Sequence, residues 1–452
     1  MMMKKLLVAN RGEIAVRIIR SAKELNIPVV LAHSSADKTS LAAQLADECV
    51  EIGPPQVAKS YLNQAAIIEA AKSVGADAIH PGYGFLAENA AFATLVENSG
   101  LTFVGPKGET IVLMGDKAEA RATAVAANVP VVPGSQGILR TLPEALAASH
   151  DVGYPLIIKA AAGGGGKGMR VVEKEEDFAK EFEVAQREGL GAFGDDGMYL
   201  ERFIPRARHI EVQVLGDGEN VIHLYDRECS LQRRRQKVLE EAPSPALNDD
   251  VREALCASAV ALAKSVNYRG AGTVEYLFDD QSGEFFFIEM NTRIQVEHPI
   301  TEMITGIDLI REMLHIASGR PLRYQQSDIT IRGAAIECRI NAEDPTNNFM
   351  PNIGKVEHLQ WGSGPGVRID SMLFEGYSVP PFYDSMLAKM IVWDETRTEA
   401  LNRMARAISE TKIEGFKTTL KLHLALVNDP EVRAGDTHTN WLEGWMDKQT
   451  WD

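Results

Sequence analysis

The sequence lacks the features of membrane-spanning and secreted proteins. Its 452 residues contain no apolar run of about 18, so we expect no membrane-spanning helix. The amino terminus is too short for a signal peptide and runs directly into a strand pattern. The four cysteines, Cys49, Cys229, Cys256 and Cys338, lie far apart and form no C-x-x-C pair. We therefore expect free thiols in a reducing compartment, and a cytoplasmic protein.

Positive charge is also scarce. Lysine and arginine number 47 against 63 aspartates and glutamates, which gives a net charge of −16 at pH 7. Such a chain is a poor partner for nucleic acid or for an anionic membrane, and we expect it to bind neither. Hydrophobic residues make up 45% and charged residues 24%, as in ordinary globular proteins. At this length we expect two to four domains with ample core.

Two familiar nucleotide-binding fingerprints are missing. The chain has neither G-x-G-x-x-G after its first strand nor G-x-x-x-x-G-K-[ST] anywhere, which argues against a dinucleotide site and a P-loop. The opening is nevertheless α/β, since apolar strand patterns alternate with a helical one. The predicted strands are 5–9, 28–32, 76–79 and 102–104, and the predicted helix is 12–26. The segment 80–85, HPGYGF, follows a strand at the sheet edge where ligands bind in open α/β folds.

A glycine-rich segment joins two further strand patterns. Residues 154–159 and 169–172 are apolar, and four consecutive glycines, including Gly165 and Gly166, lie between them. Glycines free the backbone to place N–H groups around phosphates. Lys159 and Lys167 flank the run. We expect a glycine-rich hairpin that closes over a triphosphate; a flexible surface linker is the alternative.

The most informative segment is a predicted β-hairpin with two acidic residues. Strand patterns at 272–278 and 284–291 flank a turn, and its midpoint sets Glu275 opposite Glu289. Opposed side chains lie about 5 Å apart at Cβ, where like charges repel. A divalent cation resolves that conflict, and Asn291 adds a neutral oxygen on the Glu289 face. Two carboxylates and an amide suit Mg²⁺ or Mn²⁺. The alternative is a solvated hairpin with exposed acids.

A basic run and a charged tract indicate an anion site. The run extends from Gln232 to Lys237 and carries three consecutive arginines. It suits an anion, although a solvated charged face is the alternative. Downstream of the metal hairpin, Arg293 offers a cation for a small anion and Glu297 a carboxylate to take its proton.

Other candidates carry weaker signals. The strand pattern 198–204 could pair with an adenine through its edge, or be an ordinary buried strand. His209 and His298 are more typical of structural histidines, and Cys229 of an inert, packed thiol. Near the C-terminus, several short strand patterns precede a helical stretch at 396–409.

Taken together, the motifs resemble those of the biotin carboxylase component of biotin-dependent carboxylases such as acetyl-CoA carboxylase, which are ATP-grasp enzymes. The resemblance runs nearly end to end, over segments 9–14, 80–89, 114–117, 232–243, 287–299 and 337–345. It implies an α/β fold, α+β overall, with three domains. These are an open N-terminal α/β domain (1–114), an ATP-grasp domain (115–330) with a small β-rich lid (about 131–204), and a mixed C-terminal domain (331–452).

The resemblance also assigns site residues. ATP would lie between the glycine-rich lid and the rest of the grasp. It would contact Lys117, Lys159, Gly165, Gly166, Glu201, Arg202, Phe203, Ile204, His209, Gln232 and Arg235. Glu275, Glu289 and Asn291 would bind Mg²⁺. Lys237, Arg293 and the Val296 backbone would hold bicarbonate, Glu297 would act as its base, and Arg339 would stabilise the biotin enolate.

Three positions depart from the family pattern. Arg235 stands where many relatives have His or Asn, so only its position near ATP carries over. Ala162 replaces a frequent glycine and Lys167 a frequent arginine, and neither change removes an essential role.

Biotin itself is expected on another protein. Carrier domains present Met-Lys-Met, and the nearest match, Leu387 to Met390, lacks the first Met and lies in a strand pattern. The implied partners are a biotin carboxyl carrier protein or subunit, carboxyltransferase subunits, and a second copy in a homodimer. The transferase reads the final acceptor, which leaves acetyl-CoA, other acyl-CoAs and keto acids open.

Two other functions compete with this one. A different ATP-grasp carboxylate–amine ligase would share the lid and the metal hairpin, but would not need Arg293, Glu297 and Arg339 together. A non-catalytic, nucleotide-binding paralogue would have lost a metal ligand or the base, and here these residues are all present.

Overall fold

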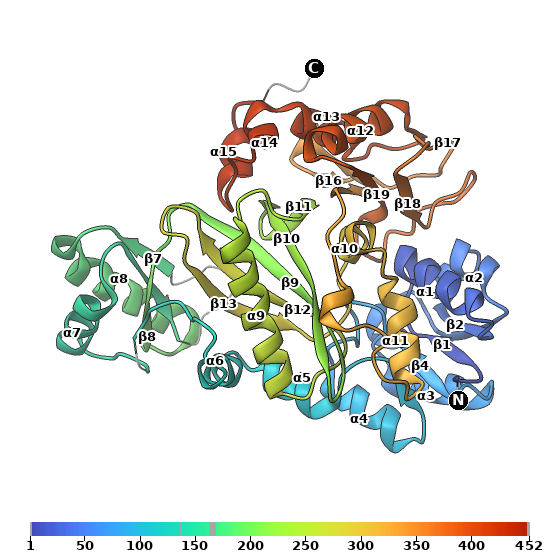
Figure 1. The fold of residues 1–452 in the computed structure, drawn as a ribbon, viewed down its shortest axis with the longest axis horizontal. Helices are drawn as coiled ribbons and strands as arrows, with labels where there is room; N and C mark the ends of the chain where they lie inside the picture. The colour runs from blue at the N-terminus through green and yellow to red at the C-terminus, as the bar shows by residue number, and fades with distance from the viewer. Residues whose placement is uncertain (1, 136, 162–168, 450–452) are drawn as a thin grey trace. The chain divides into compact units, whose positions relative to one another are not determined.

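The computed structural model describes residues 2–135, 137–161 and 169–449. These residues form two compact units (Figure 1). The larger comprises Met1–Val129, Arg208–Tyr276 and Glu289–Asp452; the smaller comprises Pro130–Ala207 and Leu277–Ile288. The predicted phosphate contacts Gly165 and Gly166, with Ala162 and Lys167, lie outside the described residues.

The N-terminal part of the larger unit is the predicted open α/β layer. Its five-stranded parallel sheet has the order β3-β2-β1-β4-β5. The strands are β1 (Leu6–Val8), β2 (Val29–Ser34), β3 (Glu48–Gly53), β4 (Ala78–His80) and β5 (Thr102–Phe103). Every strand predicted in this region is confirmed.

The first helix ends slightly before its predicted boundary. Helix α1 spans Gly12–Glu24, and its apolar face, which includes Ile14 and Ile18, joins the core formed with β1 and β2. Asn26 has a φ of 57°. This left-handed conformation ends a helix, and asparagine tolerates it better than most residues. The remaining helices of this region are α2 (Leu41–Leu45), α3 (Gln64–Ser73), α4 (Ala90–Asn98), α5 (Gly108–Gly115) and α6 (Lys117–Ala126).

An eight-stranded sheet forms the centre of the larger unit. Its order is β13-β12-β9-β10-β11-β14-β19-β18. The strands are β9 (Ala207–Asp217), β10 (Val221–Arg233), β11 (Gln236–Ala242), β12 (Arg269–Asp279), β13 (Phe285–Asn291), β14 (Ala334–Asn341), β18 (Val367–Ser371) and β19 (Met386–Asp394). Helix α9 (Asp249–Ser265) runs along this sheet (Figure 1). The C-terminal strands β14, β18 and β19 thus extend the sheet begun by β9 to β13 instead of forming a sheet apart.

The other elements surround this sheet. They are α10 (His298–Thr305), α11 (Leu309–Ala317), β15 (Glu343–Asp344), β16 (Met350–Pro351), β17 (His358–Gln360), α12 (Arg397–Glu410), β20 (Lys412–Glu414), α13 (Leu420–Asn428), α14 (Pro430–Ala434) and α15 (Trp441–Met446). The predicted helix at 396–409 corresponds to α12, and Thr396 caps it by accepting the Glu399 N–H. Among the described residues, no helix has the length and apolar character needed to cross a membrane.

The described part of the smaller unit contains a three-stranded sheet, two helices and the tip of the hairpin formed by β12 and β13. The sheet order is β7-β6-β8, from β6 (Leu156–Ala160), β7 (Met169–Val172) and β8 (Met198–Arg202). Helices α7 (Leu142–Val152) and α8 (Glu175–Phe193) complete it. Because β6 and β7 pair antiparallel, the prediction that the glycine-rich segment connects two strands is confirmed.

Candidate active site

The predicted metal hairpin is present, and its acids are close enough to interact. Glu275 on β12 and Asn291 on β13 are buried, and Glu289 is half-buried. Burial raises the pKa of Glu289, and the negative charge of Glu275 raises it further. The charges of Lys117 and His209 lower this pKa, but the net shift is upward. The two carboxylates therefore repel each other, as the sequence predicted.

The Lys237 ammonium connects three carboxylates. Its Nζ lies 2.5 Å from Glu211, 3.2 Å from Glu275 and 2.5 Å from Glu297. Burial opposes its charge, but these carboxylates outweigh burial and hold the pKa of Lys237 well above its usual value. The basic run thus delivers one half-buried cation to the acidic cluster instead of forming a solvated face at this position.

Arg339 approaches Glu297 from the C-terminal strand β14. Its guanidinium donates to Glu297 Oε2 at 2.9 Å and to Glu240 Oε1 at 2.6 Å. Burial would raise the pKa of Glu297, but Lys237 and Arg339 hold it well below its usual value. The predicted base is therefore ionised, and the fold brings Lys237, Glu297 and Arg339 together from three distant parts of the chain.

Arg293 connects the metal hairpin to the N-terminal domain. It donates to Asn291 Oδ1 at 2.7 Å and pairs with Glu88 at 2.8 Å. Burial acts against its charge, but Glu88 outweighs burial and raises the pKa of Arg293. The predicted bicarbonate cation and the predicted metal ligand Asn291 therefore lie side by side.

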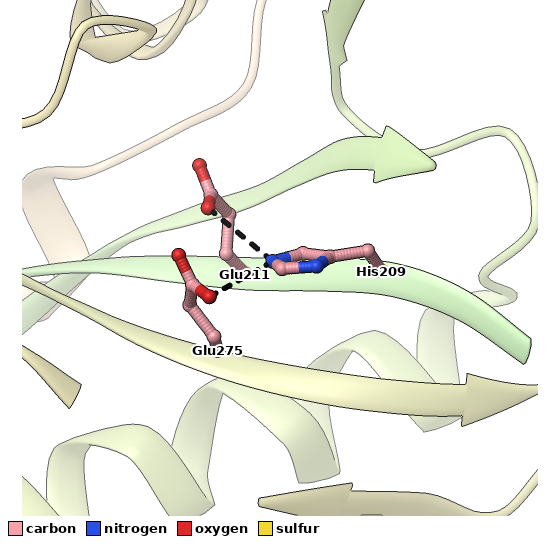
Figure 2. A group of neighbouring side chains, drawn as sticks. All are labelled: His209, Glu211 and Glu275. Atoms are coloured by element: carbon pink, nitrogen blue, oxygen red, sulfur yellow. Dashed lines mark ion pairs between the residues drawn. The ribbon is translucent and has the colours of Figure 1, made fainter. Parts of the chain in front are cut away.

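A second acidic group surrounds His209 (Figure 2). Its Nε2 lies 3.1 Å from Glu275 Oε2 and 3.9 Å from Glu211 Oε2, with His209 and Glu211 on β9 and Glu275 on β12. Glu211 is already neutralised, because Arg227 bonds its Oε1 at 2.6 Å and Lys237 its Oε2. A cation here would displace two buried ion pairs, so this group is a poorer metal site than the hairpin acids.

The hairpin residues fit a divalent cation. Glu275 and Glu289 repel each other, and a cation between them would relieve that repulsion. The buried Asn291 side chain adds an amide oxygen, which accepts one hydrogen bond from Arg293 at 2.7 Å and keeps a second lone pair. Oxygen donors of this kind suit Mg²⁺.

The predicted ATP residues are placed as follows. Lys117 is exposed at the first position of α6. In the smaller unit, Lys159 on β6 forms an ion pair with Glu201 on β8. Arg202 forms an ion pair with Glu284. Ile204 is buried in a small cluster with Val132 and Phe286.

The outer edge of β8 is partly occupied. The Arg202 N–H donates to Pro133 O, and the Ser135 N–H donates to Leu200 O. The Phe203 N–H donates to Pro155 O. The adenine contact of this strand stays a prediction.

A tight turn separates the members of the basic run. Strands β10 and β11 pair from Arg233 to Gln236, and Arg234 and Arg235 have φ values of 49° and 65°. Two central residues with positive φ are typical of a type I′ hairpin turn. Arg235 is exposed at its tip, whereas the Gln232 amide lies 3.1 Å from His209 Nδ1. Gln232 and Lys237 therefore join the cluster described above.

Two residues considered in the sequence are structural, as expected. Burial raises the pKa of the Cys229 thiol well above its usual value, which keeps it neutral and unreactive. His298 is fully buried and bonds the Gln295 carbonyl through Nδ1.

Several residues of the cluster escaped sequence reasoning. They are Glu88, Glu211, Arg227 and Glu240. Glu211 lies two positions after His209 on β9, so the strand period would have placed both on one face. Arg227 is fully buried within β10, where Asp226 and Glu228 flank it, and this run of charges inside a strand pattern was a signal for it.

A buried histidine next to the site supplies a pH-dependent prediction. His423 donates from Nε2 to Arg339 O at 2.6 Å, and burial lowers its pKa to about 4. Because the unfolded imidazole takes up a proton below about pH 6.5, this residue stabilises the fold less as the pH falls from there towards 4.

We therefore expect His423→Gln, which cannot titrate, to flatten the pH dependence of stability. Between pH 7 and pH 5 the free energy of unfolding should fall by about 2 kcal/mol less in the variant than in wild type. This follows from about 1.4 kcal/mol for each pH unit over which only the unfolded imidazole is protonated. Urea unfolding at both pH values measures it. Parallel pH dependences for the two proteins would contradict this assignment.

Comparisons with known proteins agree with this geometry. Residues 2–111 match the family model "Biotin carboxylase, N-terminal domain", and residues 337–444 match "Biotin carboxylase C-terminal domain". Between them, residues 116–325 match "Carbamoyl-phosphate synthase L chain, ATP binding domain".

Individual relatives are similar over nearly the whole chain. Biotin carboxylase 1 of Bacillus subtilis is 53% identical over 98% of each chain. The biotin carboxylase domain of a thermophilic 2-oxoglutarate carboxylase bound to bicarbonate has a TM-score of 0.94 and 46% identity, over 98% of each chain. A structure of that domain from Hydrogenobacter thermophilus, described as a dimer in complex with MgADP, ADP and bicarbonate, has a TM-score of 0.88 and 46% identity over 100% of each chain.

The fold and the charged cluster define an ATP-grasp ligase, with an N-terminal α/β domain and a C-terminal domain on either side of the ATP-grasp segment in the sequence. The chain belongs to the biotin carboxylase family.

Proposed function

We propose that this chain uses MgATP and bicarbonate to carboxylate biotin held by a separate carrier protein. The observation that carries the proposal is the convergence of Lys237, Glu297 and Arg339. It is supported by the near-complete match to biotin carboxylases and by the bicarbonate bound to a structural neighbour.

Bicarbonate would bind among the cations next to the base. Lys237 and Arg293 supply positive charge, and the Val296 backbone supplies further contacts. When bicarbonate takes hydrogen bonds from Lys237, Glu297 loses a donor that holds its pKa down. Its carboxylate then becomes a stronger base at the moment when it must remove the bicarbonate proton. One arrangement of charges thus serves both binding and proton removal.

The phosphoryl group would then pass from ATP to bicarbonate. A bicarbonate oxygen attacks the γ-phosphorus, ADP leaves, and carboxyphosphate forms. Glu275, Glu289 and Asn291 would hold Mg²⁺ or Mn²⁺, which neutralises phosphate charge, while Lys117 and Lys159 contact the phosphates. Glu201, Arg202, Phe203 and Ile204 would contact the adenine, and His209 the ribose region; Gln232 and Arg235 would lie near ATP. Positioning and charge neutralisation supply most of the acceleration.

The second half of the reaction makes carboxybiotin. Carboxyphosphate releases CO₂ and phosphate, and phosphate removes the proton from N1 of the biotin ureido group. Arg339 would stabilise the resulting enolate, whose N1 attacks CO₂. Arg339 lies 2.9 Å from Glu297, which supports one site for both halves.

The wider assembly follows from the same proposal. We propose a biotin carboxyl carrier and carboxyltransferase subunits as partners, and a homodimer such as the one described for the Hydrogenobacter domain. The four free cysteines support a cytoplasmic location. Domain boundaries at 1–114, 115–330 and 331–452 are supported by the family matches, and a lid at about 131–204 by the smaller unit.

Transfer of labelled carbon tests the proposal. The protein is incubated with MgATP, radiolabelled bicarbonate and a high concentration of free biotin. We expect ATP-dependent label in the biotin fraction, which acid releases as CO₂. Label that never enters biotin, with either free biotin or a biotinylated carrier domain, would contradict the proposed function.

A further inference from the structure

A buried lysine near the C-terminus raises a separate question. Lys389 belongs to the segment Leu387–Met390, the nearest match to a biotin attachment sequence. It lies inside β19, between β14 and β18, and is 0% exposed. A side chain enclosed in the folded protein is not open to enzymatic biotinylation. Burying a charged amine is costly, so its partners indicate its role.

Lys389 contacts the loop that carries the predicted base. Its Nζ donates to Val296 O at 2.8 Å and lies 3.2 Å from Glu13 Oε1. On the adjacent strand, Arg339 is its direct partner in register, so both side chains leave the sheet on the same face. Arg339 bonds the Glu297 carboxylate. Two neighbouring cations therefore hold two consecutive residues. Lys389 holds the Val296 carbonyl, and Arg339 holds the Glu297 side chain.

On the basis of the proposed function, we infer that Lys389 is a positioning residue for bicarbonate, which acts through the Val296 carbonyl. The peptide between Val296 and Glu297 is planar. A bond to the Val296 carbonyl therefore also holds the Glu297 N–H and the Glu297 Cα, from which the side chain of the base extends. A charge-assisted bond is stronger than a neutral one and suits this purpose. Glu13 acts as the counter-ion, held in turn by the Tyr83 hydroxyl, which donates to its Oε1.

A purely structural role makes a different prediction. If Lys389 only neutralises Glu13 in the core, its removal lowers stability without affecting one substrate more than another. If it positions the bicarbonate site, its removal changes the kinetics of bicarbonate and leaves those of MgATP alone. Lys389→Met keeps most of the side-chain volume and removes the donor, so it separates the two roles.

The expected effect is specific to one substrate. We expect Lys389→Met to lower kcat/KM for bicarbonate about 10- to 100-fold, the range for loss of one charge-assisted hydrogen bond, with less than a twofold change in KM for MgATP. The double variant Lys389→Met/Glu13→Gln removes both charges and should show the same loss. Glu13→Gln alone keeps the bond to Val296 and should retain kcat/KM for bicarbonate within about threefold.

Arg397→Met is the matched control. Arg397 also pairs with a glutamate, Glu241, and also donates to backbone carbonyls, those of Val432 and Arg433. Those carbonyls belong to α14, so this variant should lower the melting temperature but leave kcat/KM for bicarbonate near wild type.

Each outcome decides the inference. Equal losses for bicarbonate and MgATP, or no loss for bicarbonate, overturn it while the proposed function stands. If Lys389→Met and the double variant both fail to fold while Glu13→Gln folds, Lys389 has a structural role, and this result also overturns the inference. A wild-type protein whose ATP cleavage ignores bicarbonate contradicts the proposed function itself, and the inference with it.

Discussion

Glu297→Gln should reduce bicarbonate-dependent ADP formation by about 10²- to 10⁴-fold, the contribution typical of a positioned general base. Glutamine keeps the size of the side chain, but Lys237 and Arg339 donate to different oxygens of Glu297, so its single carbonyl oxygen keeps one of the two bonds. It cannot take the bicarbonate proton. MgATP binding, measured by calorimetry, should stay within about threefold of wild type, because Glu297 has no predicted contact with the nucleotide.

Glu241→Gln is the control for this variant. Glu241 is also buried on β11 and pairs with Arg397, away from Lys237 and Arg339. We expect near-normal turnover from it. Near-normal turnover of Glu297→Gln would remove Glu297 as the base, and loss of MgATP binding would show that the change disrupts the wider site.

Glu289→Gln should raise the Mg²⁺ concentration needed for half-maximal ADP formation by at least about 10-fold, and should lower kcat as well. The change removes one of the two anionic ligands of the predicted cation site. Glu289 is the better test than Glu275, because Glu275 also holds Lys237, His209 and Gln295, and its loss would disturb those partners. Titration of ADP formation with Mg²⁺ at fixed ATP measures the effect.

The turn of the same hairpin provides the control. Asp280→Asn removes an acid from the turn between β12 and β13 and should leave the Mg²⁺ dependence unchanged. Chelation of the metal should abolish ADP formation in wild type, and added Mg²⁺ or Mn²⁺ should restore it. An unchanged Mg²⁺ dependence of Glu289→Gln would contradict the metal role of Glu289.

The part of the site that lies close together in sequence was predictable. Strand patterns around one turn placed Glu275 opposite Glu289, and the period of two placed Asn291 on the same face. The same reasoning joined the glycine-rich segment to two antiparallel strands. Both hairpins form where the sequence predicted them, because strand pairing around a turn depends on local turn chemistry and alternation, which a single segment of sequence contains. The placement of Glu275 directly opposite Glu289 stays a prediction.

Contacts between distant segments were not predictable from patterns alone. Arg339 meets Glu297 across 42 positions, and only the resemblance to a family placed both in one site. The continuation of the central sheet from β11 into β14 depends on the pairing of residues 239–242 with residues 335–338, which no local signal specifies. Lys389 is a further case, because its sequence resembles a modification site and only its burial and its bond to Val296 reveal another role.

ADP release from MgATP is the most direct test of the central claim, measured with and without bicarbonate and with and without a high concentration of free biotin. The predicted result is release that requires bicarbonate and that biotin stimulates. Release indifferent to both additions would contradict biotin carboxylation and indicate a different ATP-grasp ligase. No release at all, even with a biotinylated carrier, would instead indicate a nucleotide-binding paralogue.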